Sequence, residues 1–343
     1  MEYNNISIRC GYPFVGYTLR KLKTFLTKME LIYDEGIEFS VCLFNQDDDI
    51  IATGSLEGNV LKCVAVSDKY QGEGLAAKIV TRLVDECYNN NQHHIFLFTK
   101  PKNQVMFTDL GFYTIISTED VLFMENIKGG IVKFIESLKS PYYGDEIGAI
   151  VVNCNPFTKG HEYLIKAASK ECDLLHVFVL SENKSAFPTD VRVKLVKMGV
   201  RNLKNVIVHE TSDYLISSAT FPSYFIKDKE NVDNINCTLD LSIFYEYIVK
   251  RLNIKKRFVG TEPFCKVTNE YNKQMIEFLN KKGIEVIEIP RYKIDNIEVS
   301  ASRVRKLLEK GNYKEIQKIV PKTTYDFLIS EQGQEIALSI KNN

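Results

Sequence analysis

Residues 147–164 (IGAIVVNCNPFTKGHEYL) are of the types expected where a buried strand turns sharply into a helix. The apolar run at 150–152 predicts the strand, and apolar residues at helical spacing after Thr158 predict the helix. Backbone N–H groups at the start of a helix have no partner within it, and the helix dipole favours negative charge there. We therefore expect this corner to bind an anion, and phosphate is the natural candidate.

A second turn suited to phosphate follows an expected strand at 60–66. Its residues Gln71, Gly72, Gly74 and Ala76 lead into a helix with apolar residues on one face. Small residues let a diphosphate approach the backbone N–H groups of a helix start. The pattern Gln71-x-x-Gly74-x-Ala76 resembles the coenzyme A-binding segment of the GCN5-related acetyltransferases. A glycine-rich helix entry without a ligand is the alternative.

The elements around this turn follow the order of the acetyltransferase family. They are strands at 37–44, 50–56 and 60–66, the helix, a strand at 95–99, a short helix near 103–109 and a strand at 113–116. The first two strands form an antiparallel hairpin. The resemblance implies an α+β domain with an acetyltransferase-like mixed sheet over residues 1–128.

One residue departs from this family's pattern at a position that matters for catalysis. In many of these enzymes a tyrosine four residues before the equivalent of Gly111 protonates the departing thiolate of coenzyme A. Phe107 occupies that position and has no proton to donate. The resemblance therefore implies a domain that binds a pantetheine-type arm, rather than one that completes acetyl transfer, unless another acid replaces the tyrosine.

The second half of the chain alternates strands with helices. Turn-forming residues bracket a short linker helix at 129–144, and the second domain follows at 145–343 and ends in C-terminal helices. After the corner at 147–164 we expect strands at 174–180, 205–209, 256–260 and 285–289, and helices at 189–200, 239–252 and 268–282. This alternation predicts an α/β domain with a Rossmann-like, doubly wound parallel sheet, which binds ligands at the carboxyl ends of its strands.

Two motifs in this half resemble the signatures of the nucleotidylyltransferase superfamily. Thr158-x-Gly160-His161 looks like the T/H-x-G-H motif, and residues 299–305 (VSASRVR) look like the second signature, I-S-x-T/S-x-x-R. The resemblance implies that Thr158 and His161 donate hydrogen bonds to the α-phosphate of a nucleotide, where negative charge builds as pyrophosphate leaves. Asn155, Pro156, Phe157 and Gly160 would complete this corner.

The second signature would hold the rest of a triphosphate. Ser300 and Ser302 at a helix start, with Arg305 on its first turn, would bind the β- and γ-phosphates, and Mg²⁺ would share their charge. We assign no protein side chain to the metal. Taken singly, His161 could be a surface histidine, the two serines helix caps, and Arg305 a solvated residue.

Further candidates are less specific. Gly260, Thr261 and Glu262 follow an expected strand, where Glu262 would touch the ribose or base or would only shape the turn. Residues 217–225 mix hydroxyl groups with aromatic rings, which suits a small polar substrate, a pantetheine arm, or packing of the aromatic rings in the core. The candidates for contacting substrate are Thr220, Phe221, Tyr224, Lys184 and Arg192. Lys159 would contact phosphate or simply be exposed.

Composition sets limits on the possible partners. The 343 residues include 44 basic and 44 acidic ones, so no net charge favours nucleic acid or an anionic membrane. Neither a signal sequence nor an apolar run long enough to span a bilayer is evident, so we expect a cytoplasmic protein. The eight cysteines form no C-x-x-C pair, which favours reduced thiols over disulfides or structural zinc.

In combination, the two halves resemble the citrate lyase ligase family over nearly the whole chain. The resemblance implies an AMP-forming ligase that uses ATP and acetate to acetylate the thiol of a coenzyme A-like prosthetic group on the acyl carrier subunit of citrate lyase. The reaction would pass through acetyl adenylate and release pyrophosphate and AMP. The turn at 71–76 would hold the prosthetic arm. A bifunctional N-acetyltransferase fused to a conventional nucleotidylyltransferase is the first alternative, and a regulatory nucleotide-binding protein is the second.

Overall fold

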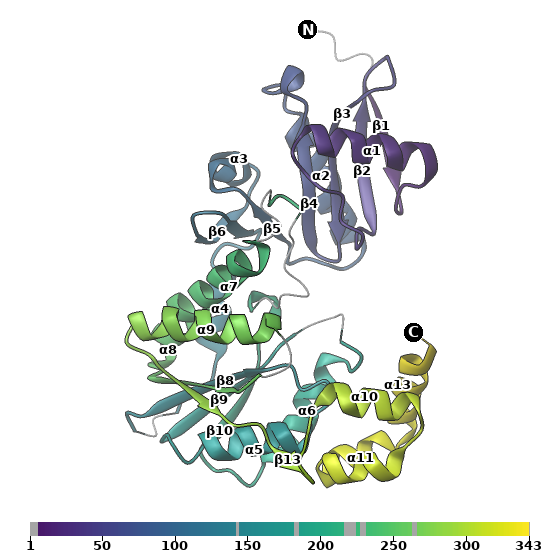
Figure 1. Ribbon diagram of the computed structural model, residues 1–343. Helices are drawn as coiled ribbons and strands as arrows, with labels where there is room; N and C mark the ends of the chain where they lie inside the picture. Colours follow the sequence, from purple (N-terminus) through teal and green to yellow (C-terminus); the bar gives the residue numbers. More distant parts are fainter. Residues whose placement is uncertain are drawn as a thin grey trace. The chain divides into compact units, whose positions relative to one another are not determined.

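The computed structural model describes residues 6–141, 144–181, 185–215, 224–226, 231–262 and 266–342. The chain forms two compact units (Figure 1). The first comprises Met1–Lys133 together with Pro222–Ile235, and the second comprises Phe134–Phe221 together with Asn236–Asn343. A short segment from the second half of the sequence therefore belongs to the first unit.

The first unit is built on a seven-stranded sheet of order β1-β2-β3-β4-β5-β7-β6. All neighbours are antiparallel except β4 and β5, which are parallel. The strands are β1 (Ser7–Gly11), β2 (Phe39–Phe44), β3 (Ile50–Glu57), β4 (Val60–Val66), β5 (Phe96–Thr99), β6 (Tyr113–Ser117) and β7 (Leu122–Glu125). The predicted mixed sheet and the β2–β3 hairpin are confirmed.

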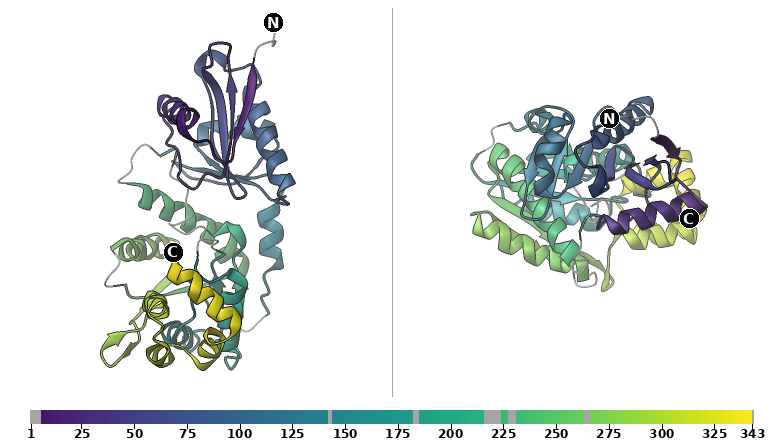
Figure 2. Two further views of the ribbon diagram at one scale, coloured as in Figure 1. Left: turned by 90° about the vertical axis from the view of Figure 1, so that its right-hand side faces the viewer. Right: turned by 90° about the horizontal axis from the view of Figure 1, so that it is seen from above.

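Helices cover this sheet on both faces. The left view of Figure 2 shows α1 (Gly16–Lys28) and α2 (Leu75–Asn89) on opposite sides of it. All six residues of β2 are therefore buried, and its sequence shows no alternation of apolar with polar residues. The apolar face of α2, formed by Leu75, Ile79, Leu83 and Cys87, belongs to the core cluster of this unit. α3 (Gln104–Asp109) precedes β6.

The two units meet in sequence within α4 (Gly130–Ser137), which lies in the stretch expected as a linker helix. The N-terminus of α4 is held by the first unit, because the buried carboxylate of Glu125 accepts a hydrogen bond from the N–H of Ile131 at 2.9 Å. The other carboxylate oxygen of Glu125 lies 2.7 Å from Nε2 of His94.

The second unit has a five-stranded parallel sheet of order β10-β9-β8-β11-β12. Its strands are β8 (Ile147–Val152), β9 (Leu174–Val179), β10 (Val206–Glu210), β11 (Lys256–Gly260) and β12 (Glu285–Ile289). The chain moves outward from β8 through β9 to β10 and then returns to β11 on the other side. This reversal makes β8 and β11 the switch point of a doubly wound sheet, as predicted.

The helices of this unit are α5 (Lys159–Ala168), α6 (Thr189–Val200), α7 (Val232–Ile243), α8 (Lys250–Leu252), α9 (Lys266–Lys281), α10 (Ala301–Glu309), α11 (Tyr313–Ile319), α12 (Lys322–Leu328) and α13 (Glu331–Asn342). α7 begins in the segment assigned to the first unit. The C-terminal helices pack beside α6, where Val304, Leu308 and Leu328 join one core cluster with Phe157 (Figures 1 and 2). A small hairpin of β13 (Lys293–Ile294) and β14 (Ile297–Glu298) leads into α10.

The expected helix at 239–252 is corrected by the structure. Helix α7 begins at Val232, and a π-helical turn (Phe244–Val249) separates it from α8. The early turns of α7 carry Asp233, Asn234 and Asn236, which are poor helix formers, and their composition conceals the true start of the helix.

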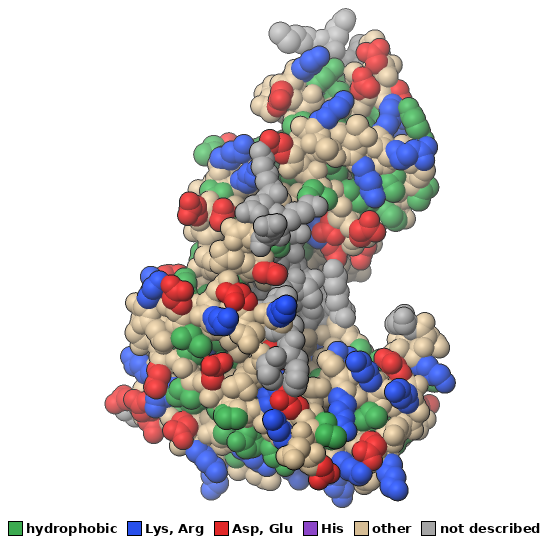
Figure 3. Space-filling model, viewed as in Figure 1, with side chains coloured by type: hydrophobic (Ala, Val, Ile, Leu, Met, Phe, Trp, Pro, Cys, Tyr) green, Lys and Arg blue, Asp and Glu red, His purple; other side chains and the backbone are tan. Residues whose placement is uncertain are grey.

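The surface and the cysteines agree with the composition. Basic and acidic side chains are interspersed on the face shown in Figure 3. No helix among the described residues has the length and apolar character needed to cross a membrane. Seven cysteines lie in the described part of the chain, and all seven are free thiols.

Candidate active site

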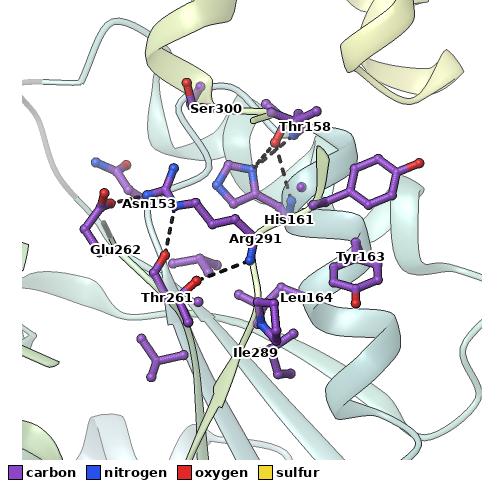
Figure 4. A pocket seen from close by; sticks show the side chains of 18 of the residues that line it. Asn153, Thr158, His161, Tyr163, Leu164, Thr261, Glu262, Ile289, Arg291 and Ser300 are labelled. Carbon is purple, nitrogen blue, oxygen red and sulfur yellow. Dashed lines mark hydrogen bonds and ion pairs between the residues drawn. The ribbon is translucent and has the colours of Figure 1, made fainter. Parts of the chain in front are cut away.

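A cavity of about 640 Å³ lies at the carboxyl ends of the central strands of the second unit (Figure 4). Its walls come from the ends of β8, β11 and β12 and from the first turns of α5 and α10. The lining includes Asn153, Thr158, Gly160, His161, Tyr163, Gly260, Thr261, Glu262, Arg291, Tyr292, Ser300 and Ser302. The cavity therefore lies at the switch point of the sheet and contains members of both sequence motifs.

Thr158 and His161 form a reciprocal cap at the start of α5. Oγ1 of Thr158 lies 3.4 Å from the N–H of His161, and the N–H of Thr158 donates to Nδ1 of His161 at 3.1 Å. Only 1% of Thr158 is exposed. Both predicted residues lie at the cavity, but the hydroxyl of Thr158 is engaged with the helix start and with the imidazole ring, which lies 3.0 Å away.

The protonation of His161 follows from this contact and from burial. Burial, aided by the positive charge of Arg291, lowers the pKa of His161 to about 4, so the ring is neutral near pH 7. Because the backbone N–H of Thr158 is a donor, Nδ1 must be the acceptor and the single ring proton resides on Nε2. Figure 4 shows the imidazole ring between Thr158 and the side chain of Arg291. His161 thus has one hydrogen-bond donor that Thr158 does not use.

The second motif reaches the cavity through the β13–β14 hairpin. Ser300 caps α10, where its Oγ accepts a hydrogen bond from the N–H of Arg303 at 3.2 Å. Ser300 and Ser302 both line the cavity, as predicted. Gly160 allows α5 to approach this segment closely, because a Cβ atom at Gly160 would lie 3.0 Å from the carbonyl oxygen of Val299. The structure therefore brings the two motifs into direct contact.

Arg305 connects the motifs in a different way from the one expected. It lies beyond the first turn of α10, and its Nη1 donates a hydrogen bond to the carbonyl oxygen of Asn155. Its Nη2 lies 3.4 Å from Oγ of Ser302. Arg305 is not among the residues that line the cavity, so contact of its side chain with phosphate stays a prediction. In this structure it holds the loop before α5 against α10.

Three predicted residues of the first corner support the cavity without lining it. Oδ1 of Asn155 accepts a hydrogen bond from the N–H of Phe187 at 2.9 Å. Pro156 is buried, and Phe157 is fully buried in the core, 6.0 Å from the ring centroid of His161. None of the three is among the residues that line the cavity, so their contact with a nucleotide stays a prediction, and in this structure the ring of Phe157 packs behind that of His161.

Gly260, Thr261 and Glu262 line the cavity at the end of β11. Arg291, which follows β12, braces this turn. Its Nε donates to the carbonyl oxygen of Thr261 at 2.9 Å, and its Nη2 pairs with the carboxylate of Glu262 (Figure 4). Contact of Glu262 with ribose or base stays a prediction, but its carboxylate is already engaged with Arg291.

Sequence reasoning missed Arg291. It lies one residue after Pro290 at the carboxyl end of a predicted strand, which is where a doubly wound sheet places its ligands. Its position after an expected strand could therefore have identified Arg291 as a candidate site residue. Tyr163 and Tyr292 were also missed, and their rings stack at 5.2 Å beside the same cavity.

The remaining substrate candidates do not gather at this cavity. Lys184, Thr220 and Phe221 lie outside the described residues. Arg192 is fully buried, and its guanidinium donates to the carbonyl oxygens of Asn153, Leu180 and Phe187 at 2.7–2.9 Å, so it is not available to a substrate. Lys159 donates to the carbonyl oxygen of Lys318 at 2.6 Å.

Tyr224 belongs to the first unit. It is 7% exposed, and its hydroxyl donates to the carbonyl oxygen of Phe98 at 2.7 Å. It is therefore not part of the lining of the cavity in the second unit.

The first unit has a cavity of its own, of about 580 Å³. Gln71, Gly72, Gly74 and Ala76 all line it, together with β4 residues Val64, Ala65 and Val66 and with Lys100 and Lys102. Gly72 and Gly74 have φ values of 82° and 72°, a conformation that favours glycine. The structure therefore gathers the predicted diphosphate-binding residues around one cavity with two lysines at its wall.

Phe107 faces the core of the first unit. It is 3% exposed, and its ring meets that of Phe112 edge-on at 6.3 Å. It does not line the cavity of this unit. The position that carries a tyrosine in many acetyltransferases thus provides packing in this chain.

Known families account for both units. The family described as "Citrate lyase ligase C-terminal domain" matches residues 147–328, and "Acetyltransferase (GNAT) family" matches residues 17–113. The chain is 39% identical over 317 residues to the citrate (pro-3S)-lyase ligase of Escherichia coli K12, covering 90% of each chain. The chain belongs to the citrate lyase ligase family. This confirms the predicted family and the prediction that the chain is a ligase enzyme.

Further relatives differ in how much of the chain they match. The citrate (pro-3S)-lyase ligase of Haemophilus influenzae is 41% identical over 317 residues, which cover 90% of this chain and 95% of that protein. A phosphopantetheine adenylyltransferase of Clostridium botulinum is 38% identical over 104 residues, which cover 29% of this chain and 59% of that protein. The citrate lyase ligases thus match nearly the whole chain, and the adenylyltransferase matches only part of it.

Proposed function

We propose that this protein uses ATP and acetate to acetylate the thiol of the prosthetic group on the acyl carrier subunit of citrate lyase. An acetate oxygen attacks the α-phosphorus of ATP, the bond to the β-phosphate oxygen breaks, and pyrophosphate leaves. The thiol then attacks the carbonyl carbon of the acetyl adenylate, and AMP leaves as the new thioester forms. Membership of the family supports this reaction, and the geometry of the second unit supports its first step.

The observation that carries the proposal is the orientation of His161. A neutral imidazole whose Nδ1 accepts from the N–H of Thr158 has an Nε2–H donor fixed in direction before any ligand binds. A preorganised donor of this kind stabilises charge that develops in the transition state, and loss of one typically costs about 10²–10³ in turnover. The α-phosphate gains negative charge as acetate attacks, so it is the group to which Nε2–H of His161 donates a hydrogen bond.

The other phosphates bind at the start of α10. Ser300 and Ser302 line the same cavity, and the N-terminus of α10 provides a partial positive charge. Among the described residues no group of three or more His, Cys, Asp or Glu side chains could hold a metal. Among the described residues that line the cavity, Glu262 carries a carboxylate, and it is paired with Arg291. Magnesium would share the charge of the phosphate oxygens of the nucleotide, and we assign no protein side chain to it.

The cavity of the first unit binds the coenzyme A-like arm. Gly72 and Gly74 leave the start of α2 open to a diphosphate, and Lys100 and Lys102 supply positive charge in the same wall. With Phe107 in the core, this unit positions the arm and transfers no acetyl group of its own.

Exchange of labelled pyrophosphate into ATP tests the first step. We expect exchange that depends on acetate, and we expect its loss in His161→Ala while ATP binding persists. His93→Ala, an exposed histidine of the first unit, is the matched control and should exchange normally. Undiminished exchange in His161→Ala would contradict the assigned role. Exchange with another nucleophile in place of acetate would favour a conventional nucleotidylyltransferase.

A further inference from the structure

The cavity of the second unit has one cationic side chain in its described lining. Arg291 lines it, and among the described residues of the lining there is no lysine and no other arginine. His161 is neutral near pH 7, and Lys159 and Arg192 donate to backbone carbonyls without lining the cavity. ATP and acetate are both anions. Arg291 is therefore the full positive charge that the described lining offers to them.

Several contacts hold the side chain of Arg291 in one orientation. Its Nε donates to the carbonyl oxygen of Thr261 at 2.9 Å, and its Nη2 pairs with the carboxylate of Glu262. Nε also lies 3.8 Å from Oε2 of Glu298. The backbone N–H of Arg291 donates to Oγ1 of Thr261 at 3.3 Å. The guanidinium is thus fixed in place before any ligand binds.

These side-chain contacts all use one edge of the planar guanidinium. An arginine has five N–H donors in a rigid arrangement, and Nε–H and one N–H of Nη2 face the turn that contains Thr261 and Glu262. The opposite edge consists of Nη1 and the second N–H of Nη2. Among the described residues it has no hydrogen-bond partner. Two parallel N–H groups match two oxygens of a phosphate, so this edge is suited to a bidentate contact with an anion.

The guanidinium lies close to the proposed phosphate donor. Figure 4 shows the imidazole ring of His161 between Thr158 and the side chain of Arg291. The positive charge of Arg291 also contributes to the lowered pKa of His161, which requires the two groups to be near each other. A phosphate that accepts the Nε2–H of His161 therefore lies beside the guanidinium.

We propose that Arg291 is a second catalytic residue of adenylyl transfer, and that its unoccupied edge donates hydrogen bonds to the α-phosphate alongside His161. This inference rests on the proposed function of the cavity as the ATP site. An acetate oxygen bonds to the α-phosphorus while the bond to the β-phosphate oxygen breaks, and negative charge spreads over the non-bridging oxygens. A fixed guanidinium stabilises that charge without rearrangement. Glu262 is then a positioning residue, because it holds the other edge.

ATP with sulfur in place of one non-bridging α-oxygen tests this contact. The two diastereomers differ only in which oxygen is replaced, and acetate-dependent pyrophosphate exchange by the full-length protein measures the rate with each, with Mg²⁺ present throughout. In Arg291→Met the ratio of the two rates should change at least about tenfold, since a hydrogen bond from a charged group is of this strength. Arg251→Met, which replaces an exposed arginine of α8, is the matched control and should keep the ratio.

The ratio distinguishes a catalytic contact from a structural one. Loss of the brace at Thr261 and Glu262 slows both diastereomers alike. An unchanged ratio in Arg291→Met would therefore overturn the inference, even if both rates fall. Arg291→Lys retains a positive charge beside Glu262 but has no bidentate edge, so it should change the ratio as well, and it serves if Arg291→Met does not fold.

Rescue provides a second readout. Arg291→Ala should exchange about 10²–10³ times more slowly than the unmodified protein with ordinary ATP, as expected for loss of a preorganised donor. Guanidinium chloride should restore part of this rate, and sodium chloride at the same concentration should not. Failure of guanidinium to restore exchange in a folded Arg291→Ala protein would contradict the assigned role.

The outcomes also separate this inference from the proposed function. If the unmodified protein shows no acetate-dependent exchange, the proposed function itself is wrong. If exchange depends on acetate, but Arg291→Met raises only the KM for acetate and keeps the diastereomer ratio, then Arg291 binds acetate. In that case the inference is wrong and the proposed function stands.

Discussion

The backbone N–H of Thr158 donates a hydrogen bond to Nδ1 of His161 across 3.1 Å. This contact decides which nitrogen of the ring bears the proton, because a backbone amide can only donate. It also ties the orientation of the ring to the start of α5, so the Nε2–H donor is fixed in direction for the phosphate contact that we propose. The hydroxyl of Thr158 lies at a similar distance from the same nitrogen, and its contribution can be separated by substitution.

Thr158→Val removes the hydroxyl and retains the backbone donor. We expect the free energy of unfolding to fall by about 1 kcal/mol through loss of the helix cap. Pyrophosphate exchange should fall less than in His161→Ala, because Nε2–H keeps its direction. Chemical denaturation and the exchange assay measure the two effects, with Thr158→Ser as the variant that retains the hydroxyl oxygen. Equal losses in Thr158→Val and His161→Ala would show that the hydroxyl itself acts on the phosphate.

The sequence predicted the residues of this site that lie close together along the chain better than it predicted the residues around them. Thr158, Gly160 and His161 lie within four residues of one helix start, so sequence spacing alone fixes their geometry. Ser300 and Ser302 were found because they match the second nucleotidylyltransferase signature, whose residues also lie close together in the sequence. Arg192 illustrates the limit. It was a candidate for contacting substrate, but its guanidinium donates hydrogen bonds to three backbone carbonyls from separate parts of the second unit. Only the assembled tertiary structure reveals such a partner set.

The same limit applies to residues 224–226 and to the first strand. Tyr224 lies in a stretch between two elements of the second half, and nothing in its composition indicates that it bonds to Phe98, 126 residues earlier. Strand β1 and helix α1 were not predicted. β1 is only five residues long, and four of them are exposed at the edge of the sheet, so it contributes little to the core.

Gly160→Ala should disturb the contact between the two motifs. The new Cβ atom would lie 3.0 Å from the carbonyl oxygen of Val299, so α5 and the segment before α10 must separate slightly. We expect the free energy of unfolding to fall by about 1–3 kcal/mol, as for other overpacked sites, and exchange to fall as well.

Gly260→Ala provides the contrast. No atom lies within 4 Å of the Cβ position there, so thermal unfolding should be unchanged while the KM for ATP rises because the cavity narrows. If Gly160→Ala were as stable as the unmodified protein, the close approach of the two motifs would be in doubt.

Arg291 should stabilise the turn that contains Glu262. Arg291→Met removes the guanidinium that pairs with a carboxylate whose side chain is only 11% exposed. We expect a loss of about 1–3 kcal/mol in the free energy of unfolding, together with a higher KM for ATP. The double variant Arg291→Met/Glu262→Gln should recover part of this stability, since the carboxylate is no longer charged. A double-mutant cycle measures the coupling, and additive losses would contradict it.

A buried histidine pair should make the second unit sensitive to acid. Nδ1 of His176 lies 2.8 Å from Nε2 of His209, and burial lowers the pKa of both rings below the ordinary 6.5. For His209, the charges of His176 and Lys197 act in the same direction. Below pH 6.5 these two histidines therefore bind protons in the unfolded chain but stay neutral in the folded chain until the pH falls to their lowered pKa values. Stability conferred by the neutral pair is complete above pH 6.5 and is lost as the pH falls below it, by about 1.4 kcal/mol per pH unit for each proton.

Replacing both histidines tests this pH dependence. In His176→Phe/His209→Leu, the free energy of unfolding between pH 7 and pH 5 should vary less than in the unmodified protein, because two of the groups that titrate only on unfolding are absent. Replacement of both partners also avoids leaving one polar atom unpaired in the core. Denaturation curves at several pH values measure the slope, and an unchanged slope would show that other groups govern acid unfolding.

The glycine-rich turn of the first unit should act on the carrier and not on the nucleotide. Gly74→Glu places a negative charge at the start of α2, where we propose that the diphosphate of the arm binds. We expect acetylation of the carrier subunit to fall at least about tenfold through weaker binding, while acetate-dependent pyrophosphate exchange continues. Gly74→Asn is the matched control, because asparagine tolerates the left-handed conformation at φ 72° without adding charge. Equal losses in both variants would assign the effect to the backbone, and normal acetylation in Gly74→Glu would place the arm elsewhere.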